Sequence, residues 1–355
     1  MTQAILLVGG AGTRLRPLTL TTPKPMLPVA GQPITEHQIR RARAAGVDRV
    51  VLGTAYRAEV FSERFGSGEP FGVDIAYAHE TTPLGTAGAI RNAAMMLTAG
   101  PDDPIVVFNG DIINGLDIAG LVDEHVRTGA AVTLHLTRVS DPRRYGLVPT
   151  DDTGRVQAFL EKPESDDQIV TDQINAGCYV FRRSIIDLIA PDRPVSVERE
   201  TFPELLRMDA LVRGVVDDSY WLDLGTPADY VQGSVDLVTG RAPGAQTTAG
   251  AQSLIVDVTS VDSSAVVRGG TALDAGVVVE SGAIVDASVV MSGVHIGAGA
   301  RVTKSAIGLG VRIESGAVVT QAVIGDGAII GARTVVASGA RIEPGAVIAS
   351  DSQID

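Results

Sequence analysis

A glycine-rich loop near the start of the chain carries three cations at close spacing. After a short apolar run come the strings Leu7-Val8-Gly9-Gly10-Ala11-Gly12-Thr13-Arg14-Leu15-Arg16-Pro17-Leu18-Thr19 and Thr22-Pro23-Lys24-Pro25-Met26-Leu27-Pro28-Val29. Glycines let backbone N–H groups approach a phosphate, because no side chain blocks the approach. Arg14, Arg16 and Lys24 can neutralise a triphosphate and its leaving end. The Walker pattern is absent, and Leu15 stands where the dinucleotide pattern GxGxxG has its third glycine. The loop therefore predicts a triphosphate site of another kind.

Two acidic residues are candidates for a magnesium site. Asp111 follows the apolar run Ile105–Phe108, where the end of a central strand would lie beside the phosphate loop. Asp223 lies between apolar residues, before a Gly-Thr-Pro helix start. An acid in such surroundings needs a partner, and a metal shared with Asp111 would supply one. The alternatives are a solvated or turn-capping Asp111 and an Asp223 that hydrogen-bonds the Gly-Thr turn.

Three further strings offer contacts to a sugar phosphate and to a base. In Phe159-Leu160-Glu161-Lys162-Pro163, Lys162 is a candidate for the phosphate and Glu161 for sugar hydroxyls, the alternative being a surface pair. Gly177 permits close approach of a ligand and Asn175 can hydrogen-bond a sugar, whereas Cys178 is assigned to the core. Glu80, or backbone carbonyls beside Gly85, could accept the N–H groups of a guanine; the alternative is a plain helix start near Thr86.

The composition excludes several classes of protein. The chain has 355 residues and a net charge of −13, which excludes a general nucleic-acid binder. One cysteine excludes a disulfide framework and a cysteine-based zinc site, and the five scattered histidines form no HxxxH pair. No apolar run reaches the roughly 18 residues that a membrane span needs. The first residues indicate a strand that leads into the glycine motif, not a signal peptide, so we expect a soluble cytoplasmic protein.

Residues 1–238 alternate between strand-like and helical patterns. We expect strands over Ala4–Val8, Arg49–Leu52, Val73–Tyr77 and Ile105–Phe108, and helices over Pro33–Ala45, Arg57–Phe65 and Thr86–Leu97. This order predicts an α/β domain with a mostly parallel sheet covered by helices, and ligands bind such sheets at the carboxyl ends of their strands. Residues 239–253 have no apolar period and indicate a linker.

Residues 254–355 repeat with a period of six. Aliphatic residues recur at steps of six or five at positions 256, 261, 267, 273, 279, 285, 290, 296, 302, 307, 313, 319, 324, 330, 336, 342 and 348. Four places beyond each of them, from Val261 to Ile342, stands Ala, Thr or Val. The pattern predicts a parallel β-helix whose coils each contain three units, with small residues near the corners.

Taken in order, these strings resemble those of the sugar-1-phosphate nucleotidyltransferases over nearly the whole chain. Members that act on GTP and mannose 1-phosphate are the most similar. That finer match rests on His79-Glu80 with Pro83-Leu84-Gly85-Thr86-Ala87-Gly88, on Ile174-Asn175-Ala176-Gly177, and on Ser196-Val197-Glu198-Arg199-Glu200-Thr201-Phe202-Pro203. The resemblance implies a Rossmann-like nucleotidyltransferase domain and a left-handed β-helix. We expect the β-helix to serve assembly and packing in a homo-oligomer, because hydrophobic rods of this kind often pair with copies of themselves.

The resemblance also implies the site residues. It assigns the nucleotide to Leu7, Gly9, Gly10, Gly12, Thr13, Arg14, Lys24, Glu80, Gly85, Thr86, Asn109 and Asp111. It assigns the sugar phosphate to Gly146, Glu161, Lys162, Asn175 and Gly177, and Mg²⁺ to Asp111 and Asp223. The expected catalytic residues are Arg14, Lys24, Asp111, Lys162 and Asp223. The implied reaction is that of GTP with mannose 1-phosphate, which gives GDP-mannose and pyrophosphate. No nucleic-acid or membrane partner is expected.

Three other interpretations remain. The substrates could be glucose 1-phosphate with UTP, dTTP or ATP, because mannose and glucose differ only at C2. A catalytically silent regulatory subunit could lose Lys24, Asp111 or Asp223, but all three are present. A β-helix that transfers acyl groups would need a catalytic base and a loop that interrupts the repeat. Here the repeat is unbroken, and His295 is its only histidine.

Overall fold

The computed structural model describes residues 2–161, 163, 165–191, 193–244, 247, 249–256 and 259–355. The chain divides into two compact units. Unit 1 comprises Met1–Gly10 and Gln38–Trp221, and unit 2 comprises Ala11–His37 and Leu222–Asp355. The domain boundaries predicted at residues 238 and 254 were placed where the sequence pattern changes, and they stay a prediction.

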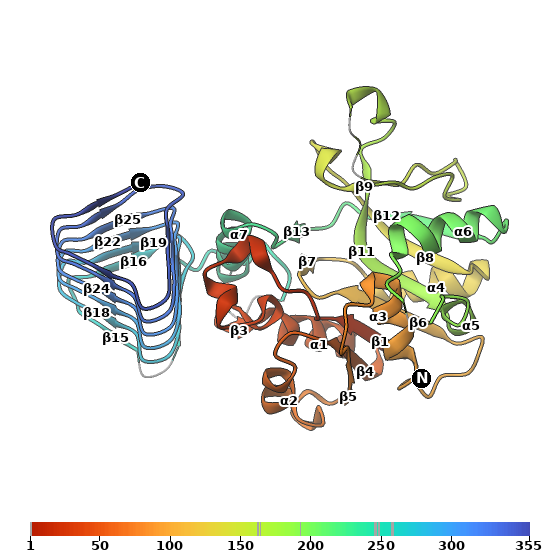
Figure 1. The fold of residues 1–355 in the computed structure, drawn as a ribbon, viewed down its shortest axis with the longest axis horizontal. Coiled ribbons are helices and arrows are strands. Elements are labelled where there is room, and N and C mark those ends of the chain that lie inside the picture. Colours follow the sequence, from red (N-terminus) through yellow and green to blue (C-terminus); the bar gives the residue numbers. More distant parts are fainter. Residues whose placement is uncertain are drawn as a thin grey trace. The chain divides into compact units, whose positions relative to one another are not determined.

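Unit 1 is built on a nine-stranded sheet whose longest path has the order β10-β9-β11-β6-β1-β4-β5 (Figure 1). β8 pairs with β11 and β12 beside this path. The central strands β6, β1, β4 and β5 are parallel, while β11 runs antiparallel to β6 and β8. The sheet contains β1 (Thr2–Leu7), β4 (Val47–Thr54), β5 (Asp74–His79), β6 (Pro104–Asn109), β8 (Val132–Arg138), β9 (Gly146–Leu147), β10 (Leu160–Glu161), β11 (Gln173–Arg182) and β12 (Val212–Val216). The predicted α/β architecture is therefore confirmed.

Helices cover this sheet, whose central strands carry runs of consecutive buried apolar side chains. α3 packs on β1, β4 and β5 and shares one core with Ile5 and Val107 through Ala87 and Ile90. α4 packs on β6 and β8, and Asp117 caps its first turn by accepting the Gly120 N–H at 3.0 Å. The α-helices up to residue 207 are α1 (Ile34–Ala44), α2 (Glu59–Phe65), α3 (Gly85–Ala94), α4 (Ile118–Thr128), α5 (Arg183–Ile186) and α6 (Phe202–Arg207). Shorter elements are β7 (Ile112–Asn114), the π-helical turn η7 (Val197–Thr201) and β13 (Trp221–Asp223).

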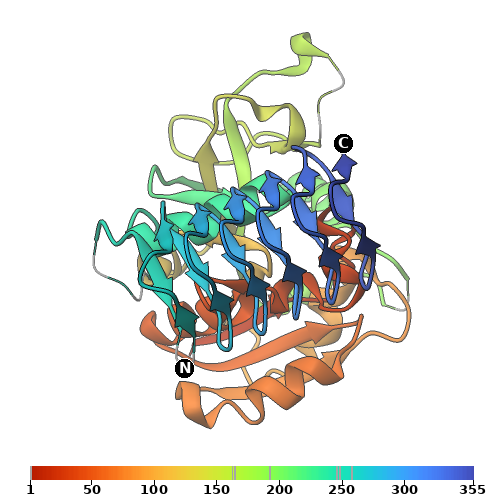
Figure 2. The same ribbon diagram turned by 90° about the vertical axis from the view of Figure 1, so that its left-hand side faces the viewer.

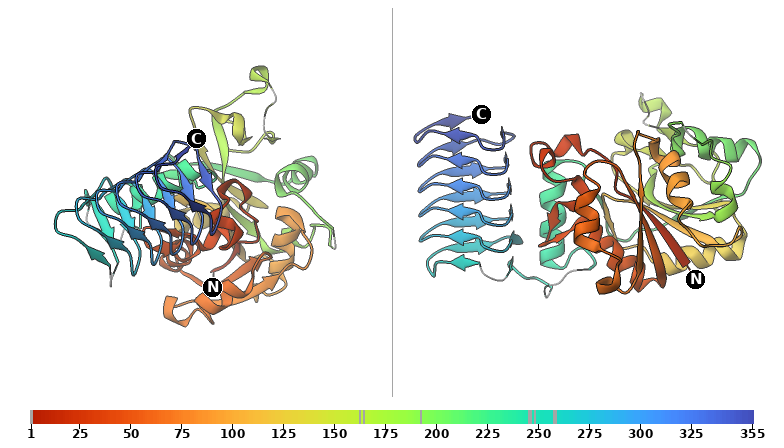
Figure 3. Two further views of the ribbon diagram at one scale, coloured as in Figure 1. Left: turned by 60° about the vertical axis from the view of Figure 1, so that its left-hand side comes forward. Right: turned by 60° about the horizontal axis from the view of Figure 1, so that its bottom comes forward.

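Unit 2 contains three six-stranded parallel sheets that form a β-helix, consistent with the left-handed hexapeptide type (Figure 2). Successive coils stack as layers, so each strand pairs with the strand three places on (Figure 3). The first sheet holds β14 (Ser253–Ile255), β17 (Thr271–Leu273), β20 (Val289–Val290), β23 (Ala306–Ile307), β26 (Val323–Ile324) and β29 (Arg341–Ile342). The second holds β15 (Ser260–Val261), β18 (Val278–Val279), β21 (His295–Ile296), β24 (Arg312–Ile313), β27 (Ile329–Ile330) and β30 (Val347–Ile348). The third holds β16 (Val266–Arg268), β19 (Ile284–Asp286), β22 (Arg301–Thr303), β25 (Val318–Thr320), β28 (Val335–Val336) and β31 (Gln353–Ile354).

The six-residue period corresponds to the inside of the β-helix. Every aliphatic member of the series from Leu273 to Ile342 is buried, and the members nearer the ends are half-buried. Between coils, Ser288 and Ser305 add buried hydrogen bonds: the Ser305 N–H donates to Ser288 Oγ, and the Ala322 N–H donates to Ser305 Oγ, both at 3.1 Å. Burial of one aliphatic and one small residue per unit therefore accounts for the repeat.

The segment 11–37 belongs to unit 2 because it is tied to α7 (Pro227–Thr239). It contains the hairpin of β2 (Pro28–Val29) and β3 (Gln32–Pro33) and the 3₁₀ turns η1 (Thr13–Leu15), η2 (Leu18–Leu20) and η3 (Lys24–Met26). The Tyr230 hydroxyl donates to the Pro28 carbonyl at 2.6 Å, and the Ala30 N–H donates to Ser234 Oγ at 3.0 Å. α7 also packs on β14 and β17 of the β-helix.

Across the described residues, no helix has both the length and the apolar character that crossing a bilayer requires.

Candidate functional site

The carboxyl end of β1 brings the first loop glycines beside Glu80. A side chain at Gly9 would lie 3.2 Å from Cβ of Ala55 and 3.5 Å from Oε1 of Glu80, whereas one at Gly10 would meet nothing within 4 Å. Glu80 is half-buried, and its Oε2 accepts the Leu84 N–H at 3.1 Å. Burial raises the pKa of this carboxyl, and the hydrogen bond from Leu84 opposes that shift. A hydrogen-bond acceptor therefore lies next to the predicted nucleotide loop.

Asp111 lies two residues beyond the end of β6, on a turn joined to β1. The Gly110 N–H donates to the Leu7 carbonyl at 2.9 Å, and a side chain at Gly110 would overlap that carbonyl oxygen. Leu7 contributes main chain to this turn, and its side chain packs against the core. The half-buried Asp111 carboxylate is thus carried at the carboxyl ends of two adjacent parallel strands, as predicted.

The start of α3 is bound to the segment that follows residue 194. A side chain at Gly85, which has a φ of 68°, would lie 2.6 Å from the Val195 carbonyl oxygen. The Thr86 hydroxyl accepts the Val197 N–H at 2.8 Å and donates to Glu198 Oε2 at 3.1 Å. Thr86 is therefore bonded to Glu198, whose string carried part of the resemblance, while the adjacent Gly85 lies against the Val195 carbonyl.

A tight turn in β11 brings Gly177 against Asn109. The pairing of β11 with β8 shifts register between Asn175 and Tyr179. Within the turn, Asn175 Oδ1 accepts the Gly177 N–H at 3.0 Å, and its Nδ2 donates to the Tyr179 hydroxyl at 2.8 Å. Gly177 has a φ of 74°, and a side chain there would lie 2.8 Å from Asn109 Nδ2 and would overlap Ile112 Cδ1. Asn175 thus holds the turn, while its contact with a sugar stays a prediction.

Gly146 and Glu161 face each other across the antiparallel pair β9–β10. A side chain at Gly146 would lie 2.7 Å from Glu161 Oε2, so the glycine gives this carboxylate its space. The structure therefore brings together two of the residues predicted to contact the sugar phosphate. Lys162, predicted to bind the phosphate itself, lies outside the described residues.

Within unit 2, Gly12 packs directly against Lys24. Gly12 has a φ of 59°, and a side chain there would lie 2.6 Å from Lys24 Cβ. The Thr19 hydroxyl donates to the Gly12 carbonyl at 2.9 Å. The Lys24 side chain is 8% exposed, and its Nζ lies 3.8 Å from Oδ1 of Asp223, whose side chain is 22% exposed. The partner that Asp223 needs is therefore supplied in part by an ammonium group, which sequence reasoning had not paired with it.

Arg14 lies in η1, where Gly225 makes room for its guanidinium. A side chain at Gly225 would lie 2.9 Å from both Nη1 and Nη2 of Arg14. Thr13 and Arg14 are exposed, and the Arg16 N–H closes the turn by donating to the Thr13 carbonyl at 3.2 Å. Unit 2 thus contains Arg14 and Lys24, the two cations predicted to bind the triphosphate.

Asp111 and Asp223 offer carboxylate oxygens, the donor type that Mg²⁺ prefers. In the part of the chain that the structure describes, no group of three His, Cys, Asp or Glu side chains is arranged to hold a metal ion. Magnesium bound by one or two carboxylates completes its coordination with water and substrate phosphates. The donor set fits such an ion. Asp111 belongs to unit 1 and Asp223 to unit 2, and their sharing of one ion stays a prediction.

Two residues that sequence reasoning missed support predicted ones. Gln38 Nε2 donates to the carbonyl oxygens of Asn109 at 2.7 Å and of Ile112 at 3.1 Å, so it braces the turn on both sides of Asp111. Gly225 gives Arg14 its space. The glycine stood in the string around Asp223 and could have been found there. Gln38 carried no sequence signal, because its role depends on a contact across 71 positions.

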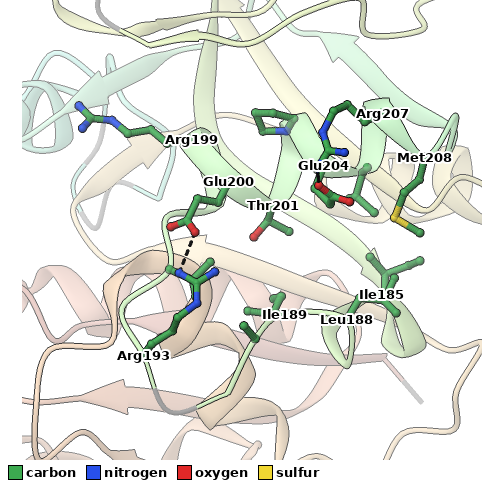
Figure 4. Close-up of a pocket in the computed structure, with 14 residues that line it drawn as sticks. Ile185, Leu188, Ile189, Arg193, Arg199, Glu200, Thr201, Glu204, Arg207 and Met208 are labelled. Atoms are coloured by element: carbon green, nitrogen blue, oxygen red, sulfur yellow. Dashed lines mark hydrogen bonds and ion pairs between the residues drawn. The ribbon is translucent and has the colours of Figure 1, made fainter.

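Unit 1 also contains a cavity of about 530 Å³ beside α5, η7 and α6 (Figure 4). Its wall includes the exposed side chains of Leu188 and Met208 and an ion pair in which Arg193 Nη1 lies 2.8 Å from Glu200 Oε2. None of the described residues that line it belongs to the predicted site. We therefore give this cavity no part in that site.

Comparisons with known proteins match both regions of the chain. Residues 3–240 match the nucleotidyl transferase family, and residues 241–323 match the GlmU-like C-terminal hexapeptide family. The mannose-1-phosphate guanylyltransferase of Mycobacterium tuberculosis is 52% identical over 76% of this chain and 74% of its own length. The catalytic subunit beta of the Drosophila melanogaster enzyme with the same name is 40% identical over 65% of this chain. This chain spans 62% of that protein's length.

A solved structure is similar to about two thirds of this chain. HddC from Yersinia pseudotuberculosis, complexed with GMP-PN, is 28% identical with a TM-score of 0.56, over 66% of this chain and 98% of its own. That likeness and the matched models agree with the α/β sheet and the β-helix described above. The chain therefore belongs to the nucleotidyl transferase family, as a nucleotidyltransferase related to the mannose-1-phosphate guanylyltransferases.

Proposed function

We propose that this protein transfers GMP from GTP to mannose 1-phosphate with the help of Mg²⁺, and releases GDP-mannose and pyrophosphate. The observation that carries the proposal is the 52% identity to the Mycobacterium tuberculosis enzyme over 76% of the chain. The geometry adds support, because each unit contains part of the predicted residue set in mutual contact. Glucose 1-phosphate with another nucleotide is the alternative within the same reaction class.

The reaction needs no protein base. A phosphate oxygen of mannose 1-phosphate attacks the α-phosphorus of GTP and forms a new P–O bond. The bond from the α-phosphorus to the oxygen that bridges it to the β-phosphorus breaks, and pyrophosphate leaves with that electron pair. The second pKa of a phosphate monoester is about 6, so the nucleophile is already anionic near neutral pH. Catalysis then consists of positioning two anions and stabilising the charge on the leaving group.

Arg14 and Lys24 are the cations that we assign to the triphosphate. Both lie in unit 2, and Gly12 and Gly225 are the glycines that leave them space. The Asp223 carboxylate, 3.8 Å from Lys24 Nζ, supports the ammonium in its buried position. Asp111 and Asp223 would hold the magnesium ion, which supplies further neutralisation of the phosphate charge when it is bound.

Glu80 is the residue that we assign to the guanine. A carboxylate accepts hydrogen bonds only, and the pairing edge of guanine presents two N–H donors next to each other. Adenine presents one donor beside an acceptor, and uracil and thymine present a single donor. Glu80 Oε1 faces Gly9, while Oε2 accepts the Leu84 N–H. The hydrogen bond from Leu84 orients the carboxylate, and its two adjacent acceptor oxygens match a base that donates twice.

The test is product analysis with the purified full chain. GTP, mannose 1-phosphate and MgCl₂ should give GDP-mannose and pyrophosphate in equal amounts, as measured by ion-exchange chromatography and a coupled pyrophosphate assay. Removal of the metal with EDTA should abolish both products, and added MgCl₂ should restore them. Formation of the products at an undiminished rate in EDTA would contradict the metal assignment, and absence of GDP-mannose with the metal present would contradict the proposal as a whole.

The proposal includes a cytoplasmic homo-oligomer. Self-association is supported by the outer face of the third β-helix sheet, where the register aligns Val266, Ile284, Arg301, Val318 and Val335. Val266 and Val335 are exposed, Ile284 and Val318 are half-buried, and Arg301 places a charge in the middle of the row. Exposed apolar side chains on one face are common at protein interfaces.

Light scattering after size-exclusion chromatography tests this assembly. The natural chain should elute at a multiple of 36.8 kDa, and Val335→Glu should shift it towards the monomer. Arg312→Glu, on the second sheet, is the control that should leave the mass unchanged. A natural chain with the mass of a monomer would contradict self-association.

A further inference from the structure

Two side chains of the β-helix hydrogen-bond the segment 13–21, which follows the glycine loop and contains Arg14. Nη1 of Arg341, the first residue of β29, donates to the carbonyl oxygens of Arg14 at 3.0 Å and Arg16 at 2.9 Å. Oδ2 of Asp326, two residues beyond β26, accepts the Thr21 hydroxyl at 2.6 Å. All of these residues belong to unit 2, so the contacts lie within one compact body.

The two contacts come from successive coils of a rigid support. β26 and β29 are neighbours in the first sheet, with Val323 opposite Arg341 in the register. Ile324 and Ile342, which follow these residues, point into the buried interior. The other carboxylate oxygen of Asp326 accepts the Leu309 N–H at 2.9 Å, so the side chain is held before it meets Thr21. The support is therefore preorganised.

The hydrogen bonds hold both ends of the segment. Arg341 contacts the main chain at η1, where Arg14 projects towards the space that Gly225 leaves, and Asp326 contacts the residue that follows η2. An arginine suits this task, because its planar guanidinium carries several donors in fixed directions and each bond to a carbonyl is charge-assisted. A lysine would supply one flexible point charge instead.

We propose that Arg341 and Asp326 are positioning residues of the nucleotidyltransferase reaction: they fix the main chain of the segment 13–21 so that Arg14 is presented to the nucleotide triphosphate. This inference rests on the proposed function for its kinetic readout. It gives the β-helix a role in the chemistry beyond packing and assembly. The role passes through the main chain of Arg14 and Arg16, so neither positioning residue needs to touch a substrate.

The test compares Arg341→Gln with the matched control Arg333→Gln. Arg333 also lies in the β-helix, and its Nε and Nη2 donate to Asp351 at 2.7 Å, so the control loses a comparable pair of hydrogen bonds. R341Q should lower kcat about 10- to 100-fold, which is the scale expected when a catalytic group is misplaced by about 1 Å. The KM for the sugar phosphate, whose predicted residues lie in unit 1, should stay within about twofold of that of the natural chain. R341K should recover part of the loss, and R333Q should match the natural chain.

Hydrogen–deuterium exchange supplies a readout that needs no substrate. Amides of residues 13–21 should exchange faster in R341Q and in T21V than in the natural chain, while peptides from the β-helix interior keep their rates. Unchanged exchange in R341Q would overturn the inference even if the proposed substrates were correct. Faster exchange with the same kcat as R333Q would also overturn it, because the segment would then be held for stability alone. If the natural chain used another nucleotide and sugar phosphate, the kinetic comparison would be made with that pair. The positioning role of Arg341 would then be tested independently of the proposed substrates.

Discussion

The Asp111 carboxylate is carried by a turn whose main chain is fixed on both sides. Gly110 donates to the Leu7 carbonyl, and Gln38 donates to the carbonyls of Asn109 and Ile112. The main chain and Gln38 therefore position the turn, while the Asp111 carboxylate is assigned to the metal. A change of that side chain should affect activity far more than stability.

Asp111→Asn should lower kcat by at least about 100-fold, because the amide is a poor ligand for Mg²⁺ and carries no charge to hold it. The melting temperature should stay within about 2 °C of the natural value, since the turn is held by main-chain contacts. Steady-state pyrophosphate release and calorimetry measure both quantities. Asp123→Asn, on the exposed face of α4, is the matched control and should behave like the natural chain. A D111N variant with nearly normal kcat would contradict the assignment of Asp111 to the metal.

Several site contacts could be predicted from residue type alone, and others could not. Glycine was expected at positions 12 and 177 to leave space, and the structure shows both at positive φ and against the side chains of Lys24 and Asn109. The proximity of Lys24 to Asp223 spans 199 positions, from 24 to 223, and no local pattern pairs them. Side-chain charge indicates that each residue needs a partner, but only the fold decides which one it receives.

At the scale of elements, the β-helix is the part that the sequence specifies most directly. Its six-residue period indicated the inward side chains correctly from Leu273 to Ile342, because each unit repeats one local environment. The parallel strands of unit 1 were predicted within a few residues, since their apolar runs end at glycine or polar residues. The turn inside β11 was not predicted, because the run Ala176–Phe181 has the pattern of an uninterrupted buried strand, while the register with β8 shifts between Asn175 and Tyr179.

That turn leads to a prediction about Gly177. Gly177→Ala places a methyl group against Asn109 and Ile112 at a φ of 74°. We expect unfolding to become easier by about 2–4 kcal/mol, as the sum of left-handed strain and overpacking. We also expect a higher KM for the sugar phosphate, because the turn carries Asn175.

Gly129→Ala is the matched control for this variant. Gly129 has a φ of 63° at the end of α4, and a side chain there would meet nothing within 4 Å. Gly129→Ala should lower the free energy of unfolding only by the left-handed strain, about 1–2 kcal/mol, and should leave the KM for the sugar phosphate unchanged. Urea denaturation and steady-state kinetics compare the two. Equal losses of stability in both variants would show that the space beside Gly177 is not needed.

At the scale of the whole molecule, segments far apart in sequence are joined within unit 2. Thr21 meets Asp326 across 305 positions, and Gly31 approaches Asp274 of the β-helix. Such contacts leave no periodic signal, because they depend on where a loop meets a coil and not on a repeated environment. This is the physical reason that the β-helix could be predicted while its attachment to the segment 11–37 could not.

Asp274 makes that attachment sensitive to pH. Its side chain is 8% exposed, and burial raises its pKa from 3.8 to about 6. A raised folded-state pKa means that the protonated acid favours folding below pH 4, and that this advantage is lost as the pH rises through 6. Burial is the main cause that raises the pKa of the Tyr230 hydroxyl, and the ionised Asp274 carboxylate raises it further.

Asp274→Asn should therefore stabilise the protein above pH 6, by at most about 3 kcal/mol, and the gain should shrink as the pH falls towards 4. Asp262→Asn is the control with the opposite sign. Hydrogen bonds from Ser264 lower the pKa of the exposed Asp262 carboxyl, so this variant should lose stability above pH 4. Chemical denaturation between pH 4 and pH 8 measures both. A D274N variant whose stability follows the natural chain over this range would contradict the burial argument.

Pyrophosphate release with Mg²⁺, measured for four nucleotides crossed with two sugar phosphates, would test the proposed specificity of this protein. GTP, ATP, UTP and dTTP would each be combined with mannose 1-phosphate and with glucose 1-phosphate. We expect release to be confined mainly to GTP with mannose 1-phosphate, with kcat/KM for every other pair lower by at least about tenfold. Preferential release with glucose 1-phosphate, or with a nucleotide other than GTP, would contradict the proposed specificity while leaving the nucleotidyltransferase fold intact.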